Sequence, residues 1–358
     1  MAANAYKETT LKDVAKASGV SMATVSRSLN DSTLIPEKTR KRVREIAREM
    51  DFEFNAHARS LVTRHVGTIG IILPPEYDRF VVNLYHGTLH SSLRHILERN
   101  DIDLIVAFLN NHFTAGNNIR KLVSRKKVDG LIIMQPMINR ELIDYLHAKD
   151  MPFVFSHYPP PDPCLPDVDV IYPDNEYGGY IAGRHLRASG KKRVLCVSTP
   201  GEKELEREYR LRLSGFRRAL GETGLALGAE DLLVGNGTME SGYDAVMGFR
   251  ESIVRYDAIF ATNDLMAIGC LLAVKELGLR VSQDIAVVGY DDTDLAACFR
   301  PSLSTIHQPR EELAQVTCER LIELIRCRHA GVARRDARRI LLAPKLIVRE
   351  TSVAEGCS

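Results

Sequence analysis

Apolar and polar positions follow two different patterns in two parts of the chain. In residues 1–55, apolar side chains recur at three- and four-residue spacing, which predicts short amphipathic helices. From Thr68 onward, short apolar runs alternate with helical stretches, and the runs are typical of buried parallel strands. The predicted strands are residues 69–73, 104–108, 131–134, 153–155, 194–197, 258–261 and 285–288. The predicted helices between them are residues 84–99, 119–126, 140–148, 177–188, 213–220, 241–254 and 265–277.

This alternation comes in two blocks, which meet near Asp174. Repeated strand–helix alternation in two blocks predicts an α/β body made of two doubly wound parallel-sheet subdomains. Ligands of such folds bind beyond the carboxyl ends of the strands, which here would face a cleft between the two halves.

Three short helices are predicted in the first part of the chain. Thr10 and Asp13 have the spacing of a helix start, in which Thr10 caps the helix and Asp13 lies in its positive first turn. Gly19 tolerates the left-handed backbone of a sharp turn, and Ser21 is a good cap for a second helix. Pro36 favours the start of a third helix. Two short helices joined by a glycine-containing turn are typical of a helix-turn-helix, although an ordinary helical hairpin has the same pattern.

Apolar positions of these helices predict a small core. Val25 and Leu29 lie four residues apart on the second helix, so we expect them to pack inward with Val14 and Val20. The third helix would close this core with Val43, Ile46, Ala47 and Met50.

The composition is that of a folded protein with several domains. The chain has 358 residues, of which 45% are hydrophobic and 26% charged, and its length favours two or three domains. Its net charge is only +2, yet residues 1–65 contain twelve Lys and Arg against eight Asp and Glu. A basic N-terminal part suits the binding of a polyanion at one end, although this excess is small.

Cysteine spacing and the N-terminal residues limit the class of protein. The seven cysteines are widely scattered without a C-x-x-C pair, so we expect reduced thiols and neither a metal nor another cofactor. The first residues lack the basic and apolar regions of a signal peptide, and no apolar stretch approaches the length of a membrane span. We therefore expect a cytoplasmic, nucleoid-associated protein without a membrane partner.

Common enzyme motifs do not occur in the sequence. It has no G-x-x-x-x-G-K-[ST], no G-x-S-x-G and no H-E-x-x-H, and Gly235-Asn236-Gly237 lacks a third glycine at the dinucleotide-binding spacing. An enzyme on a Rossmann-like fold is therefore a distant alternative, and we expect no enzymatic activity. A solute-binding protein is a third class, which the predicted helix-turn-helix and the lack of a signal peptide oppose.

The first part of the chain resembles the N-terminal signature of the lac repressor (LacI/GalR) family of transcriptional regulators. The resemblance covers some twenty consecutive positions, namely Thr10-Leu11-Lys12-Asp13-Val14-Ala15, Ala17-Ser18-Gly19-Val20-Ser21 and Ala23-Thr24-Val25-Ser26-Arg27-Ser28-Leu29-Asn30. Later stretches resemble the family as well, including Thr262-Asn263-Asp264-Leu265-Met266-Ala267 and Val288-Gly289-Tyr290-Asp291-Asp292. The resemblance implies a dimeric repressor that binds a pseudo-palindromic operator in double-stranded DNA and is controlled by a small effector.

The resemblance also implies which residues contact DNA. Met22, Ala23 and Arg27 match the positions that read base edges; Arg27 can bond bidentately to guanine, whereas Ala23 can contact only apolar surface such as a thymine methyl. Hydroxyl groups of the second helix can bind phosphate and so set the register without reading sequence. These hydroxyls belong to Ser21, Thr24 and Ser26, and Asn30 ends the matching run.

The segment after the head is predicted to be a hinge helix. It is alanine-rich but too short to be a stable helix alone, so the residues themselves also allow a plain linker. In the family this segment folds on the operator, and Leu61 matches the leucine that wedges into the minor groove at the operator centre.

The family's body has a periplasmic-binding-protein-like arrangement, in which the chain crosses three times between two subdomains. We expect these crossings near Asp174, Ile306 and Arg338. The predicted domains are 1–55 for the DNA-binding head, 56–65 for the hinge, 66–174 with 306–337 for the N-terminal effector subdomain, and 175–305 with 338–352 for the C-terminal one.

An effector site is expected in the cleft between the subdomains. Asn263 and Asp291 follow strand ends, where an amide and a carboxylate can clamp vicinal hydroxyls. Arg212 matches the arginine that contacts the effector in the family. Phe80 matches a cleft-facing position that stacks against a ring, and Gln308 a polar position on a crossing.

His157 departs from the family pattern, in which an aspartate is common at this position. The change alters either the choice of ligand or only a local contact. Because Asn263 and Asp291 suit hydroxyl groups, the sequence favours a sugar or sugar derivative as effector, with a purine-type corepressor as the alternative.

Overall fold

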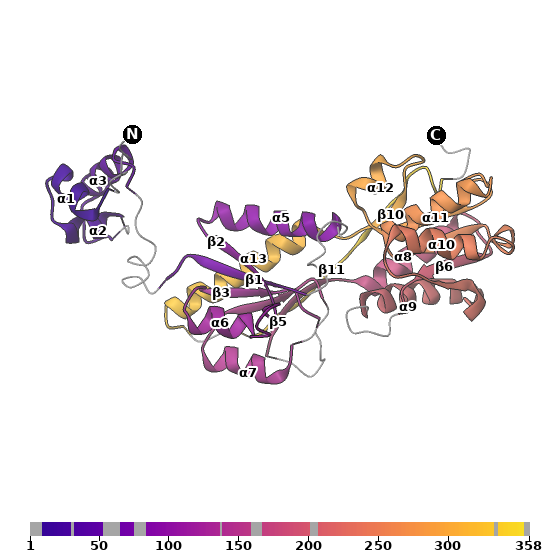
Figure 1. The fold of residues 1–358 in the computed structure, drawn as a ribbon, viewed down its shortest axis with the longest axis horizontal. Helices are drawn as coiled ribbons and strands as arrows, with labels where there is room; N and C mark the ends of the chain where they lie inside the picture. Colours follow the sequence, from indigo (N-terminus) through magenta and orange to yellow (C-terminus); the bar gives the residue numbers. More distant parts are fainter. Residues whose placement is uncertain are drawn as a thin grey trace. The chain divides into compact units, whose positions relative to one another are not determined.

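The computed structural model describes residues 9–29, 32–52, 65–74, 84–136, 138–158, 167–200, 207–332 and 336–353. The chain forms two compact units, Met1–Gly67 and Thr68–Ser358, which we call the head and the body (Figure 1). Among the described residues, no helix is both long and apolar enough to cross a lipid bilayer.

The head contains three helices, α1 (Leu11–Ser18), α2 (Met22–Leu29) and α3 (Glu37–Glu49). Thr10 and Asp13 form the predicted reciprocal capping box at the start of α1. Gly19 ends α1 with φ of 68°, a left-handed conformation that most side chains disfavour. Ser21 accepts a hydrogen bond from the backbone N–H of Thr24 at 3.1 Å, as a cap of α2 should. The predicted helix-turn-helix is therefore confirmed in its local geometry.

The core of the head lies between these three helices. Val14, Val25 and Val43 are fully or almost fully buried in it, and Ala15 and Ala47 complete the buried set. Partly buried apolar residues pack around them, namely Leu11, Val20, Leu29, Ile46, Met50 and Phe52. Such a small core ties each helix to the other two, so the position of α2 depends on buried residues of all three helices.

The first sheet of the body is parallel, with strand order β11-β5-β4-β3-β1-β2. Its strands are β1 (Thr68–Leu73), β2 (Asp103–Phe108), β3 (Gly130–Ile133), β4 (Phe153–Ser156), β5 (Asp169–Pro173) and β11 (Arg339–Leu342). Its helices are α5 (Leu84–Arg99), α6 (Asn118–Ser124), α7 (Arg140–Ala148) and α13 (Arg310–His329).

Alternate residues of these strands are buried under different helices. Ile69, Ile71 and Val154 pack in one apolar cluster with α5 and α13, which lie side by side (Figure 1). Leu131 and Phe153 pack in a second cluster with α6 and α7. Both faces of the sheet are thus covered, as the continuous apolar runs predict. The prediction of a buried strand at residues 104–108 is wrong, because β2 lies at the edge of the sheet and its residues are half-exposed or exposed.

The second sheet has the order β12-β10-β9-β8-β6-β7, and only β12 is antiparallel to its neighbour among the described pairings. Its strands are β6 (Val194–Ser198), β7 (Leu232–Val234), β8 (Ala258–Ala261), β9 (Ala286–Asp291), β10 (Ser304–His307) and β12 (Lys345–Ile347). Its helices are α8 (Asn175–Ala188), α9 (Arg207–Gly221), α10 (Met239–Gly248), α11 (Asp264–Glu276) and α12 (Asp294–Cys298).

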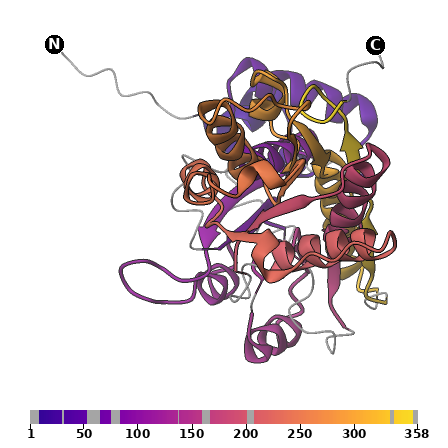
Figure 2. The same cartoon turned by 90° about the vertical axis from the view of Figure 1, so that its right-hand side faces the viewer.

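Helices again cover both faces of this sheet. Cys196 and Phe260 pack with α8 and α9, whereas Val197, Ile259 and Val287 pack with α10 and α11. Figure 2 views the body from the side of this sheet and shows helices on either side of its strands. The predicted pair of doubly wound sheets is confirmed.

The crossings between the two sheets differ in part from our expectation. The first lies at Asp174, between β5 and α8, as predicted. The second follows β10 and so lies after His307, slightly beyond Ile306. The third was expected near Arg338, which is wrong, because residues 339–342 form β11 and pair with β5 in the first sheet. The chain therefore crosses between Leu342 and Lys345.

Candidate functional site

Helix α2 carries the residues expected to contact DNA. Ser21, Met22, Ala23 and Arg27 are exposed or half-exposed, and Met22 presents 52% of its surface to solvent. Thr24 and Ser26 are half-buried. The Ser21 hydroxyl also lies 2.9 Å from the Thr24 hydroxyl, so both have partners within the head. The structure leaves Met22, Ala23 and Arg27 free to meet another surface, whereas Asn30 and Leu61 lie outside the described residues.

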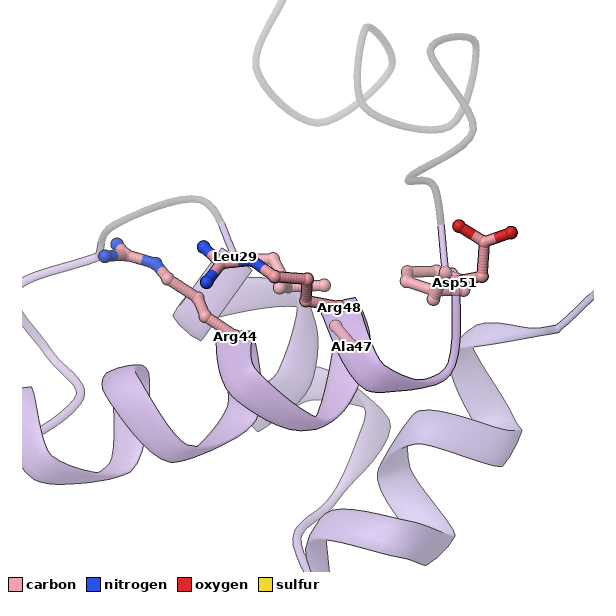
Figure 3. Close-up of a pocket in the computed structure, with 6 residues that line it drawn as sticks. Leu29, Arg44, Ala47, Arg48 and Asp51 are labelled. Carbon is pink, nitrogen blue, oxygen red and sulfur yellow. The ribbon is translucent and has the colours of Figure 1, made fainter.

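A shallow hollow lies between the end of α2 and the second half of α3. Leu29, Ala47 and Phe52 give it apolar walls, and Arg44, Arg48 and Asp51 add charge. Arg44 and Arg48 are one helical turn apart and extend from the same side of α3 (Figure 3). This places positive charge beside the end of α2, where it can contribute to the attraction of a polyanion.

In the body, Arg212 lies at the centre of a buried polar cluster. Its side chain is only 2% exposed and comes from α9. It donates to Asn175 Oδ1 at 2.9 Å and to the backbone carbonyl of Thr262 at 2.7 Å. Its guanidinium carbon also lies 3.9 Å from the centre of the Tyr290 ring, a cation–π distance. These contacts hold the cation in one orientation.

Asp291 ends strand β9 and faces this cation. Its Oδ1 lies 3.4 Å from an Arg212 nitrogen and accepts a hydrogen bond of 2.6 Å from Gln308 Nε2. Its backbone has φ of 120°, which is rare for a residue with a side chain and is typical of functional sites when neighbouring structure maintains it. Burial raises the pKa of Asp291 to about 6, against the lowering effects of Arg212 and Gln308.

Arg310 and Arg349 hold the backbone and side chain next to Asp291. Arg310 donates to the carbonyls of Asp291 and Asp292, while Arg349 donates to the Asp292 carboxylate at 2.6 Å. His307 also contacts Asp292, at 2.9 Å. The strained turn at the end of β9 is thus fixed by residues from near the second and third crossings.

Asn263 has a structural role that we did not predict. Its Oδ1 caps α11 by accepting from Met266 N–H at 2.8 Å, and its Nδ2 donates to the Gly237 carbonyl at 2.9 Å. Both polar atoms therefore already have protein partners, which leaves less capacity to clamp a hydroxyl pair.

His157 connects the two halves of the body. It follows β4 of the first sheet, and its Nε2 lies 3.5 Å from Glu208 Oε2 on α9 of the second half. The same nitrogen lies 3.0 Å from His86 Nε2 on α5. His157 and Glu208 are both buried. Burial lowers the pKa of His86 well below its usual value, and the nearby His157 and Arg212 lower it further.

Several buried polar atoms of this region have no hydrogen-bond partner among the described residues. They are Tyr85 Oη, His157 Nδ1, Glu208 Oε2, Tyr290 Oη and Gln308 Oε1. Contacts join their side chains into two groups: Tyr85 to His157 and His157 to Glu208, and Arg212 to Tyr290 and Asp291. The charge of Arg212 acts on both Glu208 and Tyr85, which connects the two groups. Buried polar groups are usually hydrogen-bonded, so a group of such atoms in one place suggests a ligand that would supply the partners. We call this group, with Arg212 and Asp291, the cleft cluster.

The cleft cluster contains residues that the sequence analysis did not select. Tyr85, Glu208 and Tyr290 are among them, and Phe80, which was selected, lies outside the described residues. Glu208 could have been found because it precedes Arg212 by four residues and so shares a face of α9. Tyr85 gave no such signal, because only the tertiary structure brings α5 to the cluster. Among the described residues, no group of three His, Cys, Asp or Glu side chains could hold a metal ion.

Comparisons with known proteins agree with this architecture. The family described as "Bacterial regulatory proteins, lacI family" matches residues 10–55, and the "Periplasmic binding protein-like domain" matches residues 184–352. A crystal structure of the lac repressor dimer bound to operator and the anti-inducer ONPF has a TM-score of 0.77 and 28% identity, covering 97% of this chain and 100% of that one.

Full-length relatives extend this agreement over nearly the whole chain. The HTH-type transcriptional repressor PurR of Photobacterium profundum is 31% identical over 343 residues, which cover 96% of this chain and 98% of the relative. The repressor of the same name from Erwinia tasmaniensis is 33% identical over 350 residues, with 97% of each chain covered. The chain therefore belongs to the lacI family of bacterial regulatory proteins.

Proposed function

We propose that this DNA-binding transcriptional repressor acts as a dimer on a pseudo-palindromic operator and is controlled by a small molecule bound in the body. The observation that carries the proposal is the cleft cluster, whose buried polar atoms lack partners among the described residues. Three of its residues, His157, Tyr290 and Gln308, lie at or just beyond strand ends of the two sheets. The lac repressor neighbour is a dimer bound to operator, which supports the dimeric state. A dimer places two heads on a two-fold axis and so reads two half-sites.

In this proposal, Met22, Ala23 and Arg27 read base edges, while Ser21, Thr24, Ser26 and Asn30 contribute phosphate contacts and register. Residues 56–65 form the hinge helix, and Leu61 is its minor-groove wedge. Leu61→Ala is then expected to weaken operator binding while the thermal unfolding of the body stays unchanged. An operator affinity equal to that of the unchanged chain would contradict the hinge assignment.

The effector would contact Arg212, Asp291, Gln308 and His157, with Phe80 as a stacking residue. The rings of Tyr85, His86, His157 and Tyr158 lie within 4.6 to 5.3 Å of one another in successive pairs. Such a group of rings suits the face of a planar heterocycle. This feature and the PurR name of the relatives favour the purine-type effector.

A sugar is the second candidate, because the Asp291 carboxylate can accept hydrogen bonds from vicinal hydroxyls. Asn263, the other residue proposed for this role, has internal partners and supports it less.

The test of the effector site is a thermal-shift measurement on the full chain with free nucleobases, nucleosides, sugars and sugar phosphates. Binding of one class is expected to raise the melting temperature, because a ligand that binds only the folded state stabilises it. Operator affinity measured with and without that compound then gives the sign of the coupling. If no compound shifts the melting temperature, and Arg212 and Asp291 variants repress and respond normally in cells, the cleft assignment is wrong.

A further inference from the structure

The atoms of the cleft cluster without partners are mainly hydrogen-bond acceptors. Gln308 Oε1 is an amide oxygen and can only accept a hydrogen bond, and Glu208 Oε2 likewise only accepts when its carboxyl group is ionised. His157 directs Nε2 toward the Glu208 carboxylate and toward His86 Nε2, and its Nδ1 has no hydrogen-bond partner among the described residues. Tyr85 and Tyr290 have hydroxyls that can either donate or accept. A ligand that satisfies this set must supply several donors.

The charges of the cleft cluster favour the same kind of ligand. Arg212 faces Asp291 and is already bonded to Asn175 and to the Thr262 carbonyl. Two other arginines near the cluster also have protein partners: Arg310 donates to two carbonyls, and Arg349 donates to the Asp292 carboxylate.

Glu208 is the carboxylate without a close cationic partner among the described residues of this cluster. The described side chain with a nitrogen near this carboxylate is His157, whose Nε2 lies 3.5 Å from Glu208 Oε2. Although burial raises it, the pKa of Glu208 stays below its usual value, because His157 and the charge of Arg212 stabilise the carboxylate. A buried carboxylate with one incomplete contact repels anions and attracts a cation or a polarised N–H group.

We propose that the effector carries an amino or amidine nitrogen that binds the Glu208 carboxylate beside His157, and that the cleft rejects phosphorylated and carboxylated compounds. This inference rests on the proposed function, since it concerns the same cleft. Glu208 is then the residue that sets the specificity for the nitrogen, and the rings of Tyr85 and His86 contact the ring that bears it. His157 orients Glu208 through their contact.

The test is isothermal titration calorimetry on the full chain with compounds that differ in one group. Adenine against purine and glucosamine against glucose each isolate an amino group. Glucosamine 6-phosphate against glucosamine, and adenosine monophosphate against adenosine, each isolate a phosphate. We expect one amino compound to bind at least tenfold more tightly than its matched partner, and its phosphorylated form to show no binding.

The Glu208→Gln variant tests the role of this carboxylate. It keeps the side-chain size and should remove the tenfold preference for the amino compound, while Glu222→Gln, an exposed carboxylate just past the same helix, should keep it. Circular dichroism and the melting temperature report whether both variants fold; if Glu208→Gln does not, the comparison of matched compounds on the unchanged chain still decides.

Each other outcome contradicts a named part of this inference. Equal binding of the matched partners, or tight binding of a phosphorylated compound, overturns the inference and leaves the proposed effector cleft in place. An amino preference that persists in Glu208→Gln overturns the assignment of Glu208. No binding of any compound overturns the inference, and with the thermal-shift test it contradicts the effector cleft as well.

Discussion

The polar residues of interest are exposed in the head and buried in the body. On α2, Met22, Ala23 and Arg27 lie at the surface and make no contribution to the core of the head. In the cleft cluster, Arg212 and Glu208 are buried and contact several neighbours. The first arrangement separates binding from stability, whereas the second makes the same side chains responsible for both.

This difference has a physical reason. DNA is a large polyanion that approaches a convex face, and its phosphates provide affinity before any base is read. A small effector has few atoms and gains affinity only where water is excluded and polar groups are preorganised. Variants in the two regions should therefore differ in which property they change.

The largest effect, a loss of unfolding free energy, is expected for Arg212→Ala. Removing the cation leaves Asp291 and the Thr262 carbonyl without this partner in a buried region, which costs about 3–5 kcal/mol of unfolding free energy. Urea unfolding of the full chain, followed for the body by tyrosine fluorescence, measures this loss. Arg217→Ala, an exposed residue on the same helix, is the control and should change stability by less than about 0.5 kcal/mol. Equal stabilities of the two variants would mean that the buried cation is not structurally important.

A smaller effect is expected for Arg27→Ala, and it concerns the affinity for DNA instead of stability. A bidentate contact to guanine contributes about 1–3 kcal/mol of discrimination, so affinity for DNA selected by the unchanged chain from a random pool should fall about 5–150-fold. The melting temperature should stay the same because Arg27 lies outside the core of the head. Glu49→Ala on α3 is the matched control for a charge on the head. If Arg27→Ala binds the selected DNA as before, Arg27 does not read a base.

The third effect concerns pH and the buried carboxyl group of Asp264. Burial and the nearby Asp291 carboxylate raise its pKa to about 8, against hydrogen bonds from Thr305 and Thr293. The folded state therefore holds a proton that the unfolded state releases, so stability falls as the pH rises from about 4 toward 8. One such proton corresponds to a slope of at most about 1.4 kcal/mol per pH unit.

Denaturant unfolding of the full chain at pH 5, 6, 7 and 8 measures this slope. Asp264→Asn should flatten it, and Asp294→Asn, a carboxyl group in the neighbouring helix α12, should leave it unchanged. A stability that rises over this range would show that Asp264 is ionised in the folded state, where its three hydrogen-bond donors favour the carboxylate.

The smallest effect is expected for Thr10→Ala in the head. It removes the side-chain cap of α1 and should cost about 1 kcal/mol locally. Hydrogen exchange of α1 amides in the full chain should become about fivefold faster. Lys12→Ala, in the same turn but outside the capping box, should leave the exchange rate nearly unchanged. If both variants exchange equally, the capping box does not limit the opening of α1.

The sequence by itself determined the elements whose signals are local. The capping box of Thr10 and Asp13, the turn at Gly19 and the strands with continuous apolar runs could all be predicted, because each depends on residues close in the chain. The family signature around Arg27 is equally local, and the match of residues 10–55 to the lacI family confirms the resemblance. The roles of Asp291 and Gln308 came from resemblance, and the structure does bring their side chains together.

Tertiary structure decided what depends on distant partners. Helix α13 was not predicted, because Arg310, Thr317 and Arg320 are buried in it and interrupt its apolar stripe. Arg320 is stable there only because it pairs with buried Asp169 at 2.7 Å, a residue far away in the sequence. Strand β11 is half-exposed and short, so its place in the first sheet follows only from pairing with β5.

The members of the cleft cluster could not be grouped from the sequence either. Its members come from α5, β9, α9 and the segments that follow β4 and β10, and no spacing along the chain relates Tyr85 to Glu208. Five of its polar atoms are buried without hydrogen-bond partners among the described residues, and burial is a property of the folded chain. The sequence therefore determined most of the elements and the family, while packing alone decided which polar atoms are buried without a partner among the described residues.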